Sequence, residues 1–246
     1  MKGVFLQQQL EFALEVNSEF HQGDNLSCKL TIKNHSSDSQ ELKFLALHLV
    51  TGDLKKVKQK VAGAFTPISS AELPTDVTIA NGEKKEFLWD VQLDRNCIVT
   101  DKAQTIFFLF GNSANLDVLG QLPLNIEPHP DVLEILSVFE SELQFIVKGK
   151  KTSKNWTNIK ISPSSAAKYT MLEQLTLSTH FEGENLELKY TFDMKKFEAT
   201  SSTLGVGKTK NTTQQTLSPQ DYKKSGFIEH AIILNYINQA LEAVGL

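Results

Sequence analysis

The chain has 246 residues, of which 40% are hydrophobic and 22% are charged, so it is long enough for one large or two small domains with cores of their own. This composition excludes an intrinsically disordered chain, which would be more charged and less hydrophobic. The formal net charge of -4 at pH 7 leaves no global positive field, which argues against nucleic acid as a partner.

The N-terminus and the cysteines indicate the cytoplasm. Met1 to Leu6, followed by three glutamines, contain no apolar run as long as the core of a signal peptide, and no later run is long enough to span a membrane. Cys28 and Cys97 are too few for a disulfide framework and too far apart for a CxxC redox or zinc site. We therefore expect a cytoplasmic protein with two reduced, buried thiols.

Apolar and polar residues alternate along the first half of the chain, which predicts β-strands with one buried face. The pattern is clearest at 26–32 and recurs at 10–16, and the turn-like residues between these two strands favour their pairing. Four more strands are predicted at 41–50, 87–93, 105–110 and 122–126. Six strands at this spacing predict one β-sandwich over residues 1–126.

A boundary follows at Pro128 and Pro130, because proline restricts the backbone and cannot donate to a central strand ladder. From Asp131 the apolar positions switch to helical spacing, which predicts a short helix. Strand patterning then returns at 143–147, 158–161, 172–181 and 186–194, and the last two strands should form a hairpin. The sequence thus predicts a second β-sandwich over residues 127–198, opened by the short helix.

The end of the chain divides into two segments. Residues 199–226 are rich in Ser, Thr, Gly, Gln and Lys without an apolar period, which predicts a flexible polar loop. Residues 227–246 carry an apolar stripe at helical spacing, and the helix has no Lys or Arg on its polar face, which disfavours membrane contact. The stripe supplies the candidate partner-binding residues, which would dock on the sandwich, on a partner or on a second copy: Phe227, Leu234, Ile237 and Leu241.

The first strands resemble the opening of arrestin-like domains. In those domains an aromatic residue and a turn of glycine and an acidic residue lead into a strand that ends at asparagine. Here Phe20 is followed by Gly23 and Asp24, and the next strand runs to Asn34.

A longer stretch resembles the sporulation-control protein family of bacteria and archaea, through Trp89 and residues 96–100, 116–118 and 126–128. The resemblance implies an all-β protein with two arrestin-like, immunoglobulin-like sandwich lobes joined near a proline-containing segment. It also implies a regulatory or scaffolding role without a known active site. Phosphate sensing is not implied, because arrestins that sense phosphorylation rely on buried arginine and acidic residues and Arg95 is the single arginine.

Several motifs have both a chemical and a structural interpretation. Residues 205–209 resemble the Gly-Lys-Thr end of a phosphate-binding loop, but the required first glycine is Ser202, so we interpret them as loop. The tripeptide 129–131 matches that of J-domain co-chaperones, but without their helical hairpin it indicates a helix start. The basic runs 55–60 and 148–154 are interpreted as solvated loops.

No catalytic residue, cofactor or metal site is predicted, because the histidines never fall at ligand spacing and no nucleophile motif is present. We expect a non-enzymatic protein that binds a protein partner, with strand addition as one mode and homo-oligomers through the C-terminal helix as a further option. Two alternatives stay open. One is an enzyme or nucleotide-dependent switch with a site assembled from dispersed residues, and the other is an exported immunoglobulin-like adhesion or pilus-type module.

Overall fold

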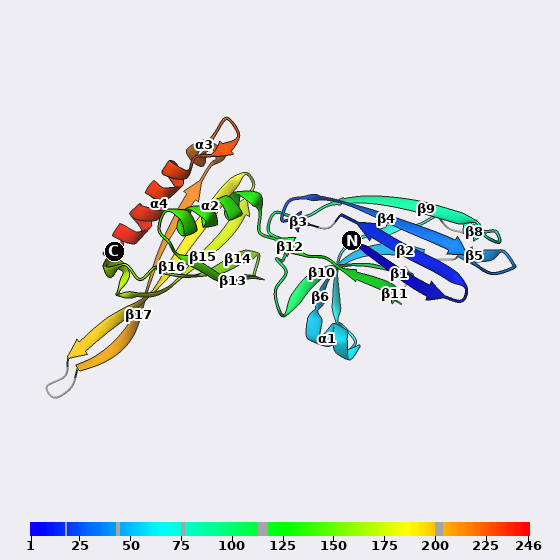
Figure 1. The fold of residues 1–246 in the computed structure, drawn as a ribbon, viewed down its shortest axis with the longest axis horizontal. Helices are drawn as coiled ribbons and strands as arrows, with labels where there is room; N and C mark the ends of the chain where they lie inside the picture. Colours follow the sequence, from blue (N-terminus) through cyan, green and yellow to red (C-terminus); the bar gives the residue numbers. More distant parts are fainter. Residues whose placement is uncertain (18, 43–44, 75–76, 113–117, 200–203) are drawn as a thin grey trace. The chain divides into compact units, whose positions relative to one another are not determined.

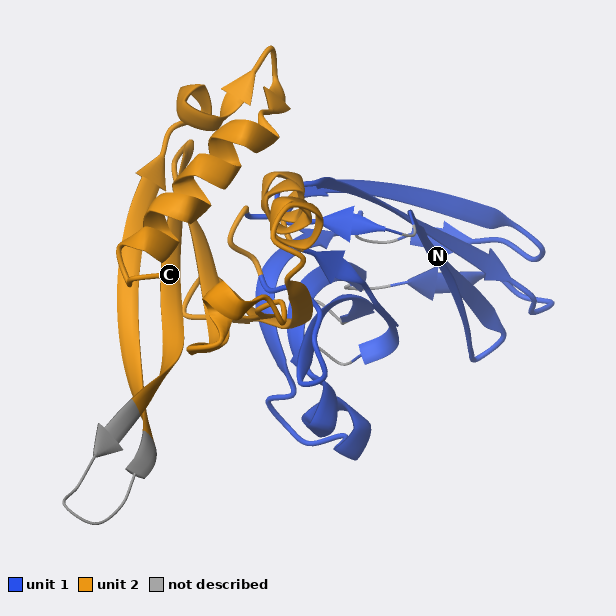
Figure 2. Ribbon diagram, turned by 60° about the vertical axis from the view of Figure 1, so that its left-hand side comes forward, with its two compact units in different colours: residues 1–94, 98–127 blue, residues 95–97, 128–246 orange. Residues whose placement is uncertain are grey.

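The computed structural model describes residues 1–17, 19–42, 45–74, 77–112, 118–199 and 204–246 (Figure 1). The chain forms two compact units (Figure 2). The first unit contains Met1–Asp94 and Ile98–Glu127, and the second contains Arg95–Cys97 and Pro128–Leu246. Three residues from within the first part of the chain therefore belong to the second unit.

The first unit is a β-sandwich of two antiparallel four-stranded sheets. One sheet has the order β1 (Lys2–Gln7), β2 (Leu10–Val16), β4 (Asn25–Asn34), β9 (Lys84–Gln92). The other has the order β11 (Val118–Pro123), β10 (Gln104–Asn112), β6 (Leu45–Asp53), β7 (Phe65–Glu72). Two short pairs join β3 (Phe20–His21) to β12 (Ile126–Glu127) and β5 (Gln40–Leu42) to β8 (Val77–Ile79). The predicted pairing of the strands at 10–16 and 26–32 is confirmed, since β2 and β4 are antiparallel neighbours.

The core of this unit lies between the two sheets, because alternate residues of each strand face inward. In β4, for example, Leu30 is fully buried. Aromatic rings connect the sheets: Phe12 of β2 stacks on Phe110 of β10 with 4.9 Å between centroids, and Trp89 of β9 meets Phe108 of β10 edge-on at 5.6 Å. Removing these large apolar surfaces from water is the main force that holds the sheets together.

The residues that resemble arrestin-like domains form two turns of this unit. The backbone N–H of His21 donates to Oδ2 of Asp24 at 2.7 Å, and Gly23 between them has a φ of 86°, which glycine adopts without strain. Asn34 is fully buried, and its amide nitrogen donates to the carbonyl oxygen of Ile79 at 2.9 Å. Asn34 thus ties the end of β4 to β8.

The second unit is built on one antiparallel five-stranded sheet, in the order β13 (Ile146–Ser153), β14 (Trp156–Ser162), β15 (Leu172–Glu182), β16 (Asn185–Ala199), β17 (Leu204–Leu217). Its helices are α2 (Pro130–Ser141), η1 (Ala167–Tyr169), α3 (Pro219–Tyr222) and α4 (His230–Glu242), and β18 (Lys223–Lys224) pairs with β19 (Phe227–Ile228). The helix predicted from Asp131 is present as α2, and so is the hairpin of β15 and β16.

Helices α2 and α4 cover one face of this sheet (Figure 1), and their apolar residues share one core with the strands. Phe139 of α2, Ile237 of α4 and Phe192 of β16 are all buried there. The all-β class is confirmed, but the second layer of this unit consists of helices where a sandwich would have a second sheet. The reason is that both helices carry an apolar stripe wide enough to cover the sheet face.

Three segments predicted as loops have regular structure. The flexible loop predicted over 199–226 is wrong, because β17, α3 and β18 lie within that segment and β17 pairs with β16 over its whole length; residues 200–203 lie outside the described residues. The second sheet therefore continues beyond residue 198, where the second lobe was predicted to end. The basic run 148–154 lies mostly in β13, and the run 55–60 forms helix α1 (Leu54–Gln59), so both loop predictions are wrong.

Candidate functional site

The four residues predicted to bind a partner differ in their exposure. Ile237 and Leu241 belong to the core of the second unit, with 1% and 3% of their surfaces exposed, and Leu234 packs against that core. The apolar stripe of the C-terminal helix is thus covered by the sheet of its own unit. Phe227 precedes α4 and lies in β19, where 79% of its surface is exposed.

Phe227 is exposed because a tight hairpin presents it. Ser225 and Gly226 form the turn between β18 and β19, with φ values of 52° and 84°. Positive φ at both central residues is the geometry of a two-residue hairpin turn. The prediction of a helix from residue 227 is therefore wrong by three residues, since α4 begins at His230.

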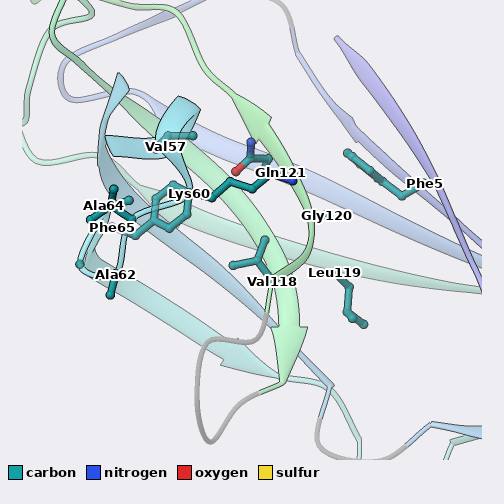
Figure 3. A pocket seen from close by; sticks show the side chains of 12 residues that line it. Phe5, Val57, Lys60, Ala62, Ala64, Phe65, Val118, Leu119, Gly120 and Gln121 are labelled. Carbon is teal, nitrogen blue, oxygen red and sulfur yellow. The ribbon is translucent and has the colours of Figure 1, made fainter. Parts of the chain in front are cut away.

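A pocket of about 780 Å³ lies in the first unit beside β11. Figure 3 shows that its side chains come from three places: α1 and the residues after it, β11, and β1. The lining residues are Phe5, Val57, Lys60, Val61, Ala62, Gly63, Ala64, Phe65, Val118, Leu119, Gly120 and Gln121. We call this site the β11 pocket.

Hydrogen bonds at both ends of α1 fix one wall of the pocket. Oδ1 of Asp53 accepts from the backbone N–H groups of Lys55 and Lys56 at 2.9 and 3.0 Å, which caps the first turn. Lys60 ends the helix in the left-handed conformation, with a φ of 53°, and its N–H donates to backbone carbonyls of the last turn, including that of Val57. A basic sequence therefore forms a helix at this place.

An apolar cluster holds α1 against the second sheet of the sandwich. Its buried members are Val50, Phe107 and Leu109, and Leu54, Val57 and Phe65 pack on them. The rings of Phe65 and Phe107 meet edge-on with 5.5 Å between centroids. Gly52 makes room for this contact, since a Cβ there would lie 2.5 Å from the Phe107 ring.

A second glycine shapes the β11 side of the pocket. Gly120 is buried opposite Phe110, and a Cβ on it would lie 2.2 Å from Phe110 and 2.8 Å from Phe5. The same two rings meet edge-on at 5.4 Å. The missing side chain of Gly120 therefore allows Phe5 of β1 to reach the pocket and rest on the core.

Most side chains that line the pocket are apolar. Among the described lining residues Lys60 carries the single charge and Gln121 is the other residue with a polar side chain. Val61 and Val118 keep 48% and 36% of their surfaces exposed, so apolar surface continues to the edge of the pocket. Such an arrangement can bind apolar groups.

The Gly-Lys-Thr motif does not form a phosphate-binding loop. Gly207, Lys208 and Thr209 are in β17, opposite residues of β16, so their backbone follows a strand ladder. The described part of this segment thus lacks the loop-to-helix geometry by which backbone N–H groups surround a phosphate.

Arg95 and its neighbour Asn96 bind the hairpin that joins β15 to β16. Nη1 of Arg95 lies 3.0 Å from Oε2 of Glu184 and donates to the carbonyl oxygen of Gly183 at 3.3 Å. The amide of Asn96 donates to the carbonyl oxygen of Phe181 at 2.8 Å and accepts from its N–H at 2.7 Å. The single arginine therefore has a structural partner in the second unit.

The described elements form two units, one a β-sandwich and the other a five-stranded sheet covered by helices. The chain has the same fold as the sporulation control protein Spo0M of Bacillus subtilis, with a TM-score of 0.64 over 96% of this chain and 99% of that one and a sequence identity of 13%. The resemblance to sporulation-control proteins is thus confirmed at the level of the fold.

Other comparisons are much weaker. A β-glucosidase from Listeria innocua in complex with laminaribiose aligns with a TM-score of 0.31 at 12% identity, over 49% of this chain and 16% of that one. The C-terminal domain of wzt aligns at 0.32 and 7% identity, over 52% of this chain and 79% of that one. No family model and no curated protein matches the sequence. Within the described residues, no helix has the length and apolar character needed to cross a bilayer.

Proposed function

We propose that this chain is a non-enzymatic regulatory protein of the cytoplasm that binds a protein partner through the β11 pocket. A regulatory role is supported by the fold, which the chain shares over nearly its full length with a sporulation control protein. The fold by itself leaves the binding surface open, because β-sandwiches carry many unrelated functions.

The observation that carries the proposal is the apolar pocket with exposed apolar residues at its edge. Val61 lies in the loop after α1 and Val118 begins β11, and both are partly exposed beside the same cavity. Covering them would remove apolar surface from water, and at about 25 cal/mol per Å² this favours association. The glycine and aromatic residues beneath hold the walls in place, so the partner meets a formed site.

Site-specific photo-crosslinking tests this proposal. A photoreactive amino acid is placed at position 61, at position 118 or, as the matched control, at Leu88, which is 77% exposed on β9 of the same unit. In a native lysate, positions 61 and 118 should give the same protein adduct and Leu88 should not. The additional substitution Val118→Asp should reduce the adduct formed from position 61. Equal adducts from all three positions, or none from positions 61 and 118, would contradict the proposal.

A further inference from the structure

The β11 pocket is larger than one side chain requires. Its volume of about 780 Å³ lies in the range of small-molecule sites, roughly 300–1,000 Å³. Its walls are aliphatic and aromatic apart from Lys60 and Gln121. A protein segment that fills it therefore has to supply more than one large apolar side chain.

Three lysines lie on the α1 side of the pocket: Lys56, Lys58 and Lys60, which we call the lysine rim. All three are exposed, and Lys60 itself lines the pocket. Successive residues of a helix are about 100° apart, so Lys56 and Lys58 lie on either side of Val57, which faces the pocket. Lys56 and Lys58 thus flank the apolar wall, whereas Lys55, about 200° from Val57, lies on the far side of the helix.

The segment that carries the lysine rim has an excess of positive charge. Residues 53–72 contain four lysines and two acidic residues, of which Asp53 caps the start of α1, and β11 carries no charged residue. Among the described residues, no carboxylate forms an ion pair with the rim. This local excess of positive charge occurs in a chain whose formal net charge is -4. Electrostatic complementarity then favours a negatively charged segment over a neutral or basic one.

The lysine rim has a fixed backbone. Asp53 caps the start of α1, and the N–H groups of Lys60 and Val61 close its end by donating to carbonyls of the helix. The contact between Phe65 and Phe107 holds the following strand. Because the helix is ordered before binding, less conformational entropy is lost when carboxylates pair with its lysines.

The exposed Phe227 hairpin of a second copy is a poor occupant. Lys224 precedes its turn and lies directly opposite Phe227 in the hairpin, whereas Lys223 forms an ion pair with Asp131. Inserting Phe227 into the pocket would therefore bring like charges close to the lysine rim, which opposes association. A bilayer is also disfavoured, because the apolar residues line a concave site, and interfacial binding needs an apolar face that enters the membrane.

We infer that the β11 pocket binds a short acidic segment of a partner protein, with at least two apolar side chains in the pocket and Asp or Glu residues against the lysine rim. The inference rests on the proposed function, because it names the chemistry of the partner at the same site. Apolar burial supplies most of the affinity, and the ion pairs select the partner and its orientation.

Selection from an unbiased peptide library tests the inference. The full chain is the bait for phage that display random 12-residue peptides, and the bait for counter-selection carries Lys56→Gln, Lys58→Gln and Lys60→Gln. Glutamine removes the charge and keeps a good helix former. The enriched peptides should contain two or more large apolar residues flanked by Asp or Glu.

Fluorescence anisotropy with an enriched synthetic peptide then gives the size of the effect. The rim variant should bind about tenfold more weakly, as expected for the loss of three exposed ion pairs. A control variant with Lys148→Gln, Lys151→Gln and Lys160→Gln, three exposed lysines of the second unit, should bind like the unchanged chain. Raising the salt concentration should weaken the unchanged chain and leave the rim variant nearly unaffected.

Three results would overturn the inference. The first is that the selection enriches no peptide, or enriches peptides without an excess of Asp and Glu. The second is that the rim variant and the control variant bind the peptide equally well. The third is that the unchanged chain binds no peptide but sediments with phosphatidylserine vesicles, while the rim variant does not sediment with them. The lysine rim would then bind a membrane. If the photo-crosslinked adduct still forms at positions 61 and 118, the proposed function stands after any of these results. If the adduct does not form, the proposed function and the inference both fail.

Discussion

Replacing Gly120 with alanine should destabilise the first unit and narrow the β11 pocket. The added Cβ would lie 2.2 and 2.5 Å from two ring atoms of Phe110 and 2.8 Å from one of Phe5. These distances are well inside the optimal separation of carbon atoms, about 3.5–4.0 Å, so both rings have to move. Phe110 has no exposed surface and stacks on Phe12 at 4.9 Å, so its movement disturbs the other sheet as well.

The size of the loss follows from these contacts. Overpacking a dense core costs about 1–3 kcal/mol. Phe110 also has ring contacts with Phe5 and Phe12, each worth about 0.5–1.5 kcal/mol beyond burial. We expect Gly120→Ala to lower the free energy of unfolding by about 2 kcal/mol. At about 4 °C per kcal/mol, the Tm of the first unit should fall by about 8 °C.

Urea unfolding and calorimetry of four variants test this reasoning. Gly149→Ala is the control, because a Cβ at Gly149 meets no atom within 4 Å. Phe110→Leu shortens the clashing side chain, so the double variant Gly120→Ala, Phe110→Leu should be more stable than the sum of the single effects by about 1 kcal/mol. If Gly120→Ala is as stable as Gly149→Ala, or if the two effects simply add, the steric explanation is refuted.

Three other residues give predictions that standard assays can check. Asp53→Ala removes the cap of α1 and should lower the free energy of unfolding in urea by about 1 kcal/mol. Asp53→Asn should have a smaller effect, because asparagine is also a good N-cap residue. Burial lowers the pKa of His48, so near pH 6.5 the unfolded chain binds a proton at this residue while the folded chain still does not. The free energy of unfolding should therefore decrease as the pH falls from about 7.5 to about 5.5, and this decrease should be smaller in His48→Leu. Burial raises the pKa of Cys28 to about 12, so iodoacetamide at pH 8 should leave it unmodified in the native chain and label it in urea, as mass spectrometry would show.

Strands with one apolar face could be predicted from the sequence, whereas β17 could not. At residues 209, 211, 213 and 215 this strand has polar side chains directed toward the helices. Gln215 shows how such a position is satisfied: its Oε1 accepts from the hydroxyl of Tyr190 at 3.2 Å, and its Nε2 donates to the carbonyl oxygen of Tyr236 at 2.9 Å. At Gln215, hydrogen bonds therefore replace the apolar contacts whose alternation predicts a strand.

The C-terminal helix was recognised, but its binding role did not follow from its sequence. An apolar stripe looks the same whether the helix packs on its own sheet or on a partner. Ile237 and Leu241 are buried against the sheet, which only the folded structure could show.

Only a small part of the β11 pocket could be predicted from the sequence. Asp53 before Leu54 and Val57 fits a capped helix start, and this signal could have located α1. The rest of the pocket is made of small or aliphatic residues from distant segments, and the role of Gly120 depends on the ring of Phe110 in the neighbouring strand. Residues of this kind become a site only when the strands pair.

The place of Asn96 also bears on how such a protein can be rearranged in evolution. A fragment that starts at Pro128 keeps every strand of the second sheet, yet it leaves the backbone N–H and carbonyl of Phe181 without the amide that pairs with both. Arg95, which binds the turn after β15, is lost with it. Gene fusion or recombination at the proline boundary would therefore separate the second unit from a tripeptide encoded within the first, and the two units should be inherited as one block.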